Sequence, residues 1–182
     1  MEPKTVGVVA SSAGGVEDLR ERFVEPLLSE GHRVAVTLTP TAARWLDEIG
    51  EVARLQEATA LPVRSEPRLP GEARPHPKID VYVAAPASAN TVAKLALGLA
   101  DNQALTVLCE NIATTPMVVF PRINAAHARH PAWDSHIALL RRADIHLVYG
   151  DAVWPLLEPR AAGDRRELPW EHILRATRRL LG

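Results

Sequence analysis

Residues 5–15 read TVGVVASSAGG, a short β-branched apolar run that ends in a turn of small residues. Such a run favours a strand, and the small residues after it favour a turn. The next segment, residues 16–29, places apolar side chains on one face at helical spacing, and Gly31 stands where a helix commonly ends. A strand, a turn and an amphipathic helix in this order indicate a βα unit and predict a parallel sheet.

The alternation of strands and helices continues along the chain. Further strands are predicted at residues 33–39, 79–84, 116–120 and 145–148, and helices at residues 42–49, 89–99, 131–142 and 170–181. This pattern predicts a sheet covered by helices on both faces. The length of 182 residues and the hydrophobic share of 47% suit one domain with a substantial core. We therefore expect a doubly wound α/β fold of the flavodoxin-like or Rossmann-like kind, with residues 1–182 as a single domain.

Prolines predict two interruptions of this pattern. Residues 61–78 hold five prolines and several arginines, and they are predicted to form a surface excursion with a short strand near residues 61–64. Ala85-Pro86-Ala87 is predicted to break the strand that begins at Ile79. Ser88 then stands where it would cap the following helix.

Composition and charge argue against several classes of function. The formal net charge of −1 gives no electrostatic case for binding nucleic acid or an anionic membrane. No stretch approaches the roughly 20 apolar residues that span a bilayer, and we expect no signal peptide. The single cysteine, Cys109, excludes an intrachain disulfide and favours a cytoplasmic setting. His127, His130 and His136 lack the pattern of a zinc site, so no metal is predicted.

Three of the predicted strand ends carry small or polar residues, and each precedes a helix: Ser11–Gly15, Thr39–Ala42 and Pro86–Thr91. In an open parallel α/β sheet, ligands bind outside the carboxyl ends of the strands. A helix N-terminus presents free N–H groups and a partial positive charge, which suit a phosphate. Hydroxyl groups at helix starts are also common as simple caps, so both interpretations stay open. The glycines do not follow the G-x-G-x-x-G pattern, which favours a mononucleotide phosphate over a pyrophosphate.

Three motifs carry a resemblance to a known family. The hexapeptide Pro86-Ala87-Ser88-Ala89-Asn90-Thr91, with GLADN at residues 98–102, resembles the signature of the homo-oligomeric flavin-containing cysteine decarboxylases. That family includes phosphopantothenoylcysteine decarboxylase and the peptidyl-cysteine decarboxylases of lantibiotic pathways, with flavin prenyltransferases as more distant relatives. Residues 7–13 resemble the family's first strand and phosphate loop, with Ser11 on the serine. Residues 121–127 resemble its Pro-x-Met-Asn-x-x-Met motif, with Asn124 on the asparagine, and the resemblance covers about residues 4 to 160.

The resemblance implies an FMN-binding site at these motifs. The first loop and the region of Thr39 would hold the FMN phosphate, and the hexapeptide would line the isoalloxazine ring. The cofactor-binding residues expected on this basis are Ser11, Ser12, Ala13, Thr39, Thr41, Pro86, Ala87, Ser88, Ala89, Asn90 and Thr91. Asn124 would face the substrate and hold its carboxylate.

The resemblance also implies a reaction and an assembly. In the family the flavin oxidises a cysteine-type thiol, and the resulting thioaldehyde serves as the electron sink for loss of CO₂. The implied substrate is a small-molecule or peptidyl thiol carboxylate. Family members are trimers or dodecamers of trimers with FMN at a subunit interface, so a homotrimer or a multiple of trimers is expected.

The chain departs from the family pattern at three positions. Where the decarboxylases carry a histidine before the aspartate of the next strand, this chain has Glu72, and the nearest candidate for the catalytic acid or base is His76. His127 replaces the last methionine of the asparagine motif and is either a polar group near the substrate or a surface residue. The family's later flap, which holds a cysteine, is missing, and only Glu158-Pro159 looks similar in that region.

These departures leave three functions open. The first is an FMN-dependent, decarboxylase-like lyase. The second is a flavin prenyltransferase-like enzyme, for which Lys94, Arg122 and Arg129 are the candidate phosphate-binding cations. The third is a flavin-binding protein without catalysis, because the family histidine is absent.

Overall fold

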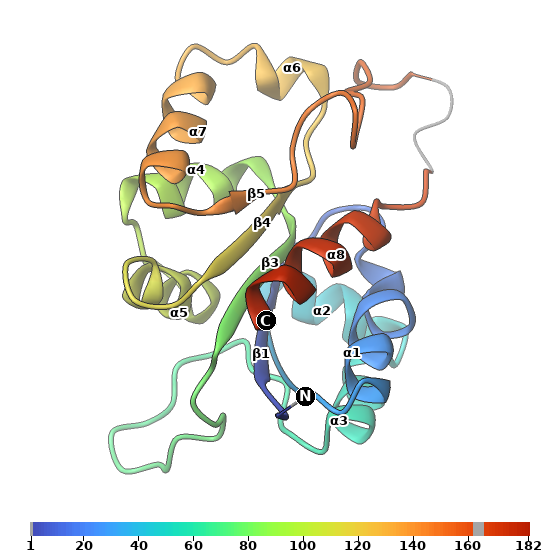
Figure 1. The fold of residues 1–182 in the computed structure, drawn as a ribbon, viewed down its shortest axis with the longest axis vertical. Helices are drawn as coiled ribbons and strands as arrows, with labels where there is room; N and C mark the ends of the chain where they lie inside the picture. The colour runs from blue at the N-terminus through green and yellow to red at the C-terminus, as the bar shows by residue number, and fades with distance from the viewer. Residues whose placement is uncertain (1, 162–165) are drawn as a thin grey trace.

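The computed structural model describes residues 2–161 and 166–182, and the strands of these residues form one parallel sheet (Figure 1). The sheet has the order β2-β1-β3-β4-β5, and every neighbouring pair is parallel. The strands are β1 (Thr5–Ala10), β2 (Arg33–Leu38), β3 (Val81–Ala87), β4 (Met117–Pro121) and β5 (His146–Leu147). The chain order reverses direction beside β1, which is the arrangement of a doubly wound α/β sheet. The predicted fold class is confirmed.

Helices follow the strands as the sequence pattern predicts. They are η1 (Val16–Asp18), η2 (Arg20–Val24), α1 (Glu25–Ser29), α2 (Pro40–Glu48), α3 (Glu51–Thr59), α4 (Ala89–Leu97), α5 (Gln103–Asn111), α6 (Ala125–Ala128), α7 (Trp133–Arg142) and α8 (Trp170–Leu181). The segment predicted as one helix at residues 16–29 is helical throughout, but it passes from a 3₁₀ turn through a π turn into an α turn. The helix α3 was not predicted from the sequence.

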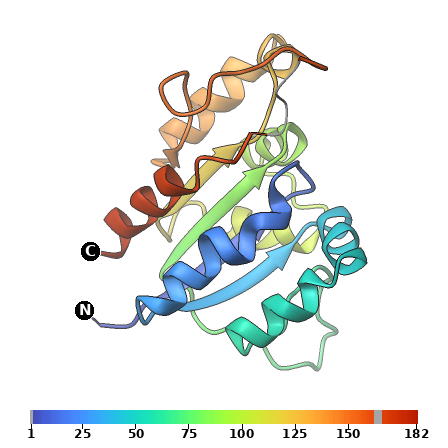
Figure 2. The same cartoon turned by 90° about the vertical axis from the view of Figure 1, so that its right-hand side faces the viewer.

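The two faces of the sheet carry separate hydrophobic cores. Val6 and Val8 of β1 point into one core with Phe23, and Val9 points into the other, because successive side chains of a strand alternate between faces. The first core receives η1 to α3 and α8, and the second receives α4, α5 and α7. Figure 2 shows the segment from η1 to α1 and α8 side by side on one face, whereas Figure 1 shows α4, α5 and α7 across the sheet.

The prediction that residues 85–87 break the third strand is wrong. β3 continues to Ala87, with a shift of register against β4 after Ala84. Proline lacks only the N–H group, and the carbonyl of Pro86 still accepts a hydrogen bond from the Ser11 amide at 2.8 Å. The first two residues of the hexapeptide, Pro86 and Ala87, therefore belong to β3, and α4 begins at Ala89.

The surface excursion of residues 61–78 is anchored to the sheet at one place. Arg64 forms a single isolated parallel bridge with Thr37 of β2, and the short strand predicted near residues 61–64 is reduced to this one bridge. Its amide donates to the Val36 carbonyl at 3.0 Å, and its carbonyl accepts from the Leu38 amide at 2.7 Å. The excursion thus begins beside β2 and returns to the sheet at β3.

Candidate functional site

Backbone hydrogen bonds join the loops that follow four strands at the carboxyl edge of the sheet. The Thr39 amide donates to the last carbonyl of β1 at 3.0 Å, which ties the start of α2 to the first loop. The Ser11 amide donates to the Pro86 carbonyl and the Arg122 amide to the Ala87 carbonyl, each at 2.8 Å. These bonds gather the loops after β2, β1, β3 and β4 at one edge, where α/β sheets of this kind bind ligands.

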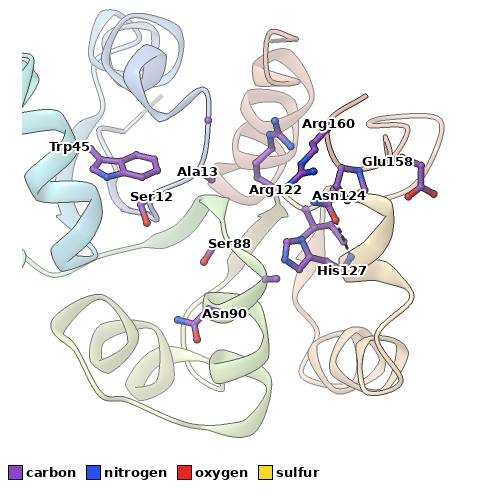
Figure 3. Close-up of a pocket in the computed structure, with 14 residues that line it drawn as sticks. Ser12, Ala13, Trp45, Ser88, Asn90, Arg122, Asn124, His127, Glu158 and Arg160 are labelled. Carbon is purple, nitrogen blue, oxygen red and sulfur yellow. Dashed lines mark hydrogen bonds between the residues drawn. The ribbon is translucent and has the colours of Figure 1, made fainter. Parts of the chain in front are cut away.

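A pocket opens at this edge, shown in Figure 3. Its volume is about 480 Å³, within the roughly 300–1,000 Å³ of small-molecule sites. The lining residues come from the first loop, α2, the β3–α4 junction, the segment after β4 and a stretch near residue 159. They are Ser12, Ala13, Gly14, Trp45, Ser88, Ala89, Asn90, Arg122, Ile123, Asn124, His127, Glu158, Pro159 and Arg160.

The structure brings together six of the residues predicted from the sequence. Ser12, Ala13, Ser88, Ala89, Asn90 and Asn124 all line this pocket. They belong to three segments that are far apart in the chain, so their meeting depends on the parallel order of β1, β3 and β4.

The other predicted cofactor residues lie behind or beside the pocket. Ser11 and Thr91 are buried, and the Ser11 hydroxyl donates to the Thr91 hydroxyl at 2.8 Å. Thr39 caps α2, where its hydroxyl accepts from the Ala42 amide at 3.4 Å. Pro86 and Ala87 are buried in β3, and Thr41 is half-buried in the first turn of α2. These residues hold the pocket walls in place.

Two pocket residues act as helix caps. The Ser88 hydroxyl accepts from the Thr91 amide at 3.3 Å, and this bond defines the start of α4. Asn124 accepts from the His127 amide at 3.0 Å through its side-chain oxygen. The cap uses one lone pair of the Asn124 oxygen and orients the side chain, which leaves the NH₂ group available as a donor to a ligand.

The first loop owes its shape to Gly15. This residue has φ +94°, a conformation that favours glycine, and a side chain there would collide with Leu168 from the segment before α8. The Gly15 amide donates to the Glu17 carboxylate at 2.9 Å. The turn places Ser12, Ala13 and Gly14 at the pocket wall.

The opposite wall of the pocket is lined by two arginines, Arg122 and Arg160. Figure 3 shows Arg122, Arg160, Asn124 and His127 gathered on one side, across from Ser12 and Trp45. The Arg122 guanidinium lies over the ring of Trp154, 5.2 Å from its centre, so that arginine is packed as well as charged. Glu158 forms a two-point ion pair with Arg129, at 2.5 and 2.9 Å.

His76, the predicted catalytic acid or base, does not line this pocket. It lies in the surface excursion, where its Nε2 is 2.7 Å from the carbonyl oxygen of Pro62. Burial lowers the pKa of His76 below its ordinary value, although the Pro62 carbonyl opposes that shift, and the nearby Arg64 lowers the pKa further. Its predicted catalytic role stays a prediction.

Two of the cations considered for a prenyl phosphate are already paired. Lys94 makes an ion pair with Asp101 at the end of α4, and Arg129 pairs with Glu158. Neither lines the pocket, whereas Arg122 does.

The sequence motifs point to neither Trp45 nor Arg160, although both line the pocket. Trp45 is 47% exposed and lines the pocket from α2, one turn after the buried Ala42. A signal for Trp45 was available, because α2 begins at the ligand-binding edge. Arg160 carries no such signal, since it reaches the pocket only through the path of the chain after β5.

Comparison with known proteins identifies the family. Residues 1–181 match the model of the Flavoprotein family. The chain belongs to the Flavoprotein family. The match covers every segment that lines the pocket.

Two solved structures of decarboxylases resemble this Flavoprotein member. The FMN-dependent cysteine decarboxylase TvaF from thioviridamide biosynthesis is 25% identical, with 80% of this chain and 90% of TvaF covered and a TM-score of 0.64. The peptidyl-cysteine decarboxylase EpiD is 19% identical over the whole of both chains, with a TM-score of 0.70, and shows the shared fold.

Curated relatives match over shorter stretches. A probable phosphopantothenoylcysteine decarboxylase of Streptococcus mutans is 30% identical over 118 residues, which are 62% of this chain and 64% of that protein. A cysteine/cysteine sulfinic acid decarboxylase of an unknown prokaryote is 35% identical over 69 residues, which are 38% of this chain and 19% of that protein. The chain thus spans less than two thirds of the length of the curated relatives that it matches.

The family and these relatives support a flavin cofactor, and the pocket residues fit one. The uncharged wall of Ser12–Gly14 and Ser88–Asn90 combines small side chains, which leave room for a flat ring, with hydroxyl and amide groups. The start of α4 presents its first N–H groups to this edge, whereas α2 contributes only the Thr41 amide, because Pro40 has no N–H and the Ala42 amide is capped by Thr39. Within residues 2–161 and 166–182, no group of three His, Cys, Asp or Glu side chains is placed to hold a metal. No helix of that part is long and apolar enough to cross a bilayer.

Proposed function

We propose that this protein binds FMN in the pocket and catalyses oxidative decarboxylation of a thiol carboxylate of the cysteine type. The observation that carries the proposal is the meeting of Ser12–Gly14, Ser88–Asn90 and Asn124 around one pocket of about 480 Å³. Membership of the Flavoprotein family and the likeness to TvaF support the same assignment.

The two helix starts and the first loop would hold the phosphate end of FMN. Thr39 and Ser88 fix where α2 and α4 begin, and the start of α4 presents backbone N–H groups with partial positive charge, to which α2 adds the Thr41 amide. Ser12 adds a hydroxyl at the pocket wall, while the Ser11–Thr91 bond holds the first loop against α4 from beneath. Ala89 and Asn90 would lie along the ring, with the Asn90 amide as a hydrogen-bonding group for its polar edge.

The proposed reaction balances with the flavin as the two-electron acceptor. The substrate's CH₂–SH group loses two electrons and two protons and becomes a thioaldehyde. The bond between the α-carbon and the carboxylate then breaks, CO₂ leaves, and its electron pair passes into the thioaldehyde to give an enethiolate. The Asn124 side-chain NH₂ would hold the carboxylate before it leaves, and Trp45 would cover the other side of the pocket from water.

FMN binding is tested by titrating the purified protein with FMN and following its visible spectrum. Asn90→Ala removes an amide at the pocket and should weaken FMN binding about fivefold to tenfold, the loss of roughly one hydrogen bond. Gln103→Ala, at the start of α5 and outside the pocket, is the matched control and should bind FMN as the native protein does. Equal FMN affinity of all three proteins would rule out this pocket.

The reaction is tested anaerobically with FMN-loaded protein and a peptide that ends in cysteine. Loss of the visible flavin band together with release of CO₂ supports the proposed reaction. Bleaching without CO₂ would reduce the activity to thiol oxidation, and no change with any thiol would contradict the proposal. A new flavin spectrum with dimethylallyl phosphate would instead favour a prenyltransferase-like activity.

The domain extent, the cellular location and the assembly of the protein are also proposals. We infer that residues 1–182 act as one flavoprotein domain and that the protein works in the cytoplasm as a homotrimer or a multiple of trimers. The support is the family resemblance and the single cysteine.

A further inference from the structure

The proposed reaction requires a group that accepts a proton from the substrate. Oxidation of a CH₂–SH group to a thioaldehyde breaks the S–H bond, and a cysteine thiol, whose ordinary pKa is about 8.5, is mostly protonated near neutral pH. His76, the histidine that the sequence suggests for acid–base chemistry, does not line the pocket. Within the chain that the structure describes, a base for the thiol therefore has to come from the residues that line the pocket.

The chemistry of these residues leaves one candidate. In the described part of the chain, the ionisable side chains that line the pocket are Arg122, His127, Glu158 and Arg160. Arginine does not give up its proton in proteins. Hydrogen bonds from Arg129 hold the pKa of Glu158 below the ordinary 4.5, which makes its carboxylate a weak base. His127 is therefore the lining residue that can take up and return a proton near neutral pH.

The local structure holds His127 beside Asn124, the residue proposed to bind the substrate carboxylate. The Asn124 side-chain oxygen caps α6 by accepting from the His127 amide at 3.0 Å. Figure 3 shows the His127 ring extending from α6 into the pocket, on the same side as Asn124. In a cysteine, three covalent bonds separate the sulfur from the carboxylate carbon. A base beside the carboxylate site therefore lies within reach of the thiol, which is the geometric requirement for proton transfer.

We propose that His127 is the proton acceptor and donor of the reaction. Its ring takes the thiol proton as the S–H bond breaks. The C–H bond next to the sulfur breaks at the same stage, its hydrogen leaves with two electrons to the flavin, and a C=S bond forms. After CO₂ leaves, the electron pair of the broken C–C bond gives an enethiolate, and the imidazolium returns its proton to that sulfur. His127 ends neutral, and the product is an enethiol.

This inference rests on the proposed function and adds the residue that moves the proton. The experiment follows the loss of the visible flavin band anaerobically, with FMN-loaded protein and a peptide that ends in cysteine, from about pH 6 to about pH 9.5. His127→Gln keeps a polar side chain that cannot take up a proton. At neutral pH it should react about 100-fold more slowly than the native protein, with the Kd for FMN within about twofold of the native value.

The pH profile separates a lost base from a disturbed pocket. The deficit of His127→Gln should shrink towards the upper end of the range, because the thiol then ionises without a base. Arg122, Arg160 and Glu158, the charged side chains that line the pocket with His127, do not titrate in this range. A native rate at neutral pH, or a deficit that is the same at every pH, would overturn the inference.

His130→Gln is the matched control. His130 is exposed and lies outside the pocket, and its Nδ1 accepts from the Ala132 amide at 3.2 Å. Glutamine retains a hydrogen-bond acceptor for that amide. This variant should react at the native rate across the whole range of pH. A loss equal to that of His127→Gln would overturn the assignment, because the effect would then not belong to the ring in the pocket.

A second readout does not depend on turnover. In NMR spectra of ¹⁵N-labelled, FMN-loaded protein, the ring signals of His127 are identified by their absence from His127→Gln. They should shift when a peptide that ends in serine is added, since serine carries the same carboxylate without an oxidisable thiol, and the ring signals of His130 should stay in place. Unmoved His127 signals would overturn the inference. Failure of the proposed function is separate, because the native protein would then neither lose its flavin band nor release CO₂ at any pH.

Discussion

At the scale of single residues, Asn124 combines two tasks that a substitution can separate. Its oxygen caps α6, and its NH₂ group would hold the substrate carboxylate. Serine is also a good helix cap, so Asn124→Ser keeps the start of α6 and removes the amide. We expect the rate of CO₂ release to fall about tenfold to 100-fold, the effect of one hydrogen bond to a charged group, with FMN affinity unchanged. A CO₂ assay and a titration with FMN measure the two quantities, and an unchanged rate would remove Asn124 from the reaction.

Gly15 controls the first loop through both its backbone and its missing side chain. A Cβ atom there would stand 2.5 Å from Cγ of Leu168, in addition to the cost of φ +94°. Gly15→Ala should therefore lower the free energy of unfolding by about 2–4 kcal/mol and weaken FMN binding. Gly50→Ala is the control, because Gly50 has φ +74° with no atom within 4 Å of the added Cβ. It should cost only about 1 kcal/mol and leave FMN binding unchanged. Equal losses in urea unfolding would contradict the role of Leu168.

His76 should make stability depend on pH near neutrality. Burial lowers its pKa in the folded protein below the ordinary value of 6.5. As pH falls below 6.5, the unfolded chain therefore takes up a proton before the folded chain does, and stability is lost. The free energy of unfolding should fall from pH 7 towards pH 5.5, and His76→Gln should reduce that slope. Urea unfolding at a series of pH values measures both slopes, and identical slopes would show that His76 does not contribute.

At the scale of elements, an ion-pair cluster ties η2 to α3. Glu51 is 6% exposed and accepts from Arg20 Nε at 2.9 Å and from Arg54 Nη1 at 2.7 Å. Glu51→Gln should lower the free energy of unfolding by about 1–3 kcal/mol, because two arginines lose a charged partner. Glu21→Gln, on an exposed member of the same cluster, should cost less.

The stability that this cluster supplies should also fall as pH falls, as for His76, although the group that titrates here is an acid. Burial would raise the pKa of Glu51, yet the hydrogen bonds from Arg20 and Arg54 outweigh it and hold that pKa below the ordinary 4.5. A carboxyl group with a lowered pKa stabilises the fold above the unfolded value and loses that effect as pH falls through the folded value. The difference in stability between native protein and Glu51→Gln should therefore shrink below pH 4.5. A constant difference would contradict the ion pairs as its cause.

Hydrophobic periodicity in the sequence predicts some of the elements and misses others. Residues 16–29 and 170–181 were recognised because their buried side chains recur at helical spacing, and Phe23, Leu27 and Ile173 are fully buried. α3 was missed because Leu55 is its main buried apolar residue. The other buried residue, Glu51, is held by ion pairs, which a hydrophobic pattern does not detect. The extent of β3 was missed because the partners of its last carbonyls, the amides of Ser11 and Arg122, come from the loops after β1 and β4.

The candidate site was predictable where local sequence determines local geometry. Ser88 could be found because it precedes a helix at a strand end, whereas Asn124 was predicted from the resemblance of residues 121–127 to the family's asparagine motif. Their common pocket follows from the parallel sheet. Trp45 and Arg160 required tertiary structure, since α2 must sit at the edge of the sheet and the chain must return after β5 to reach the pocket.

At the scale of the whole molecule, the pocket edge leaves apolar surface exposed. Trp45 of α2 lines the pocket and is 47% exposed, and Ile49, four residues later at the C-cap of α2, is 51% exposed. Large apolar side chains in such a position are typical of a surface that another subunit covers. The expected trimer, with FMN at a subunit interface, would cover this edge, and it stays a prediction.

Sedimentation equilibrium should therefore give about three times the chain mass of 19.9 kDa, or a multiple of that value. Ile49→Lys places a charge on the apolar edge and should shift the protein towards the monomer. Because the pocket opens beside this edge, FMN affinity should fall with the assembly, while the far-ultraviolet circular dichroism stays native. Leu69→Lys makes the same chemical change in the surface excursion, at a residue 67% exposed, and should leave both the assembly and FMN affinity unchanged. A native protein that sediments as a monomer with bound FMN would show that one chain completes the site, and the exposed edge of α2 would then need another explanation.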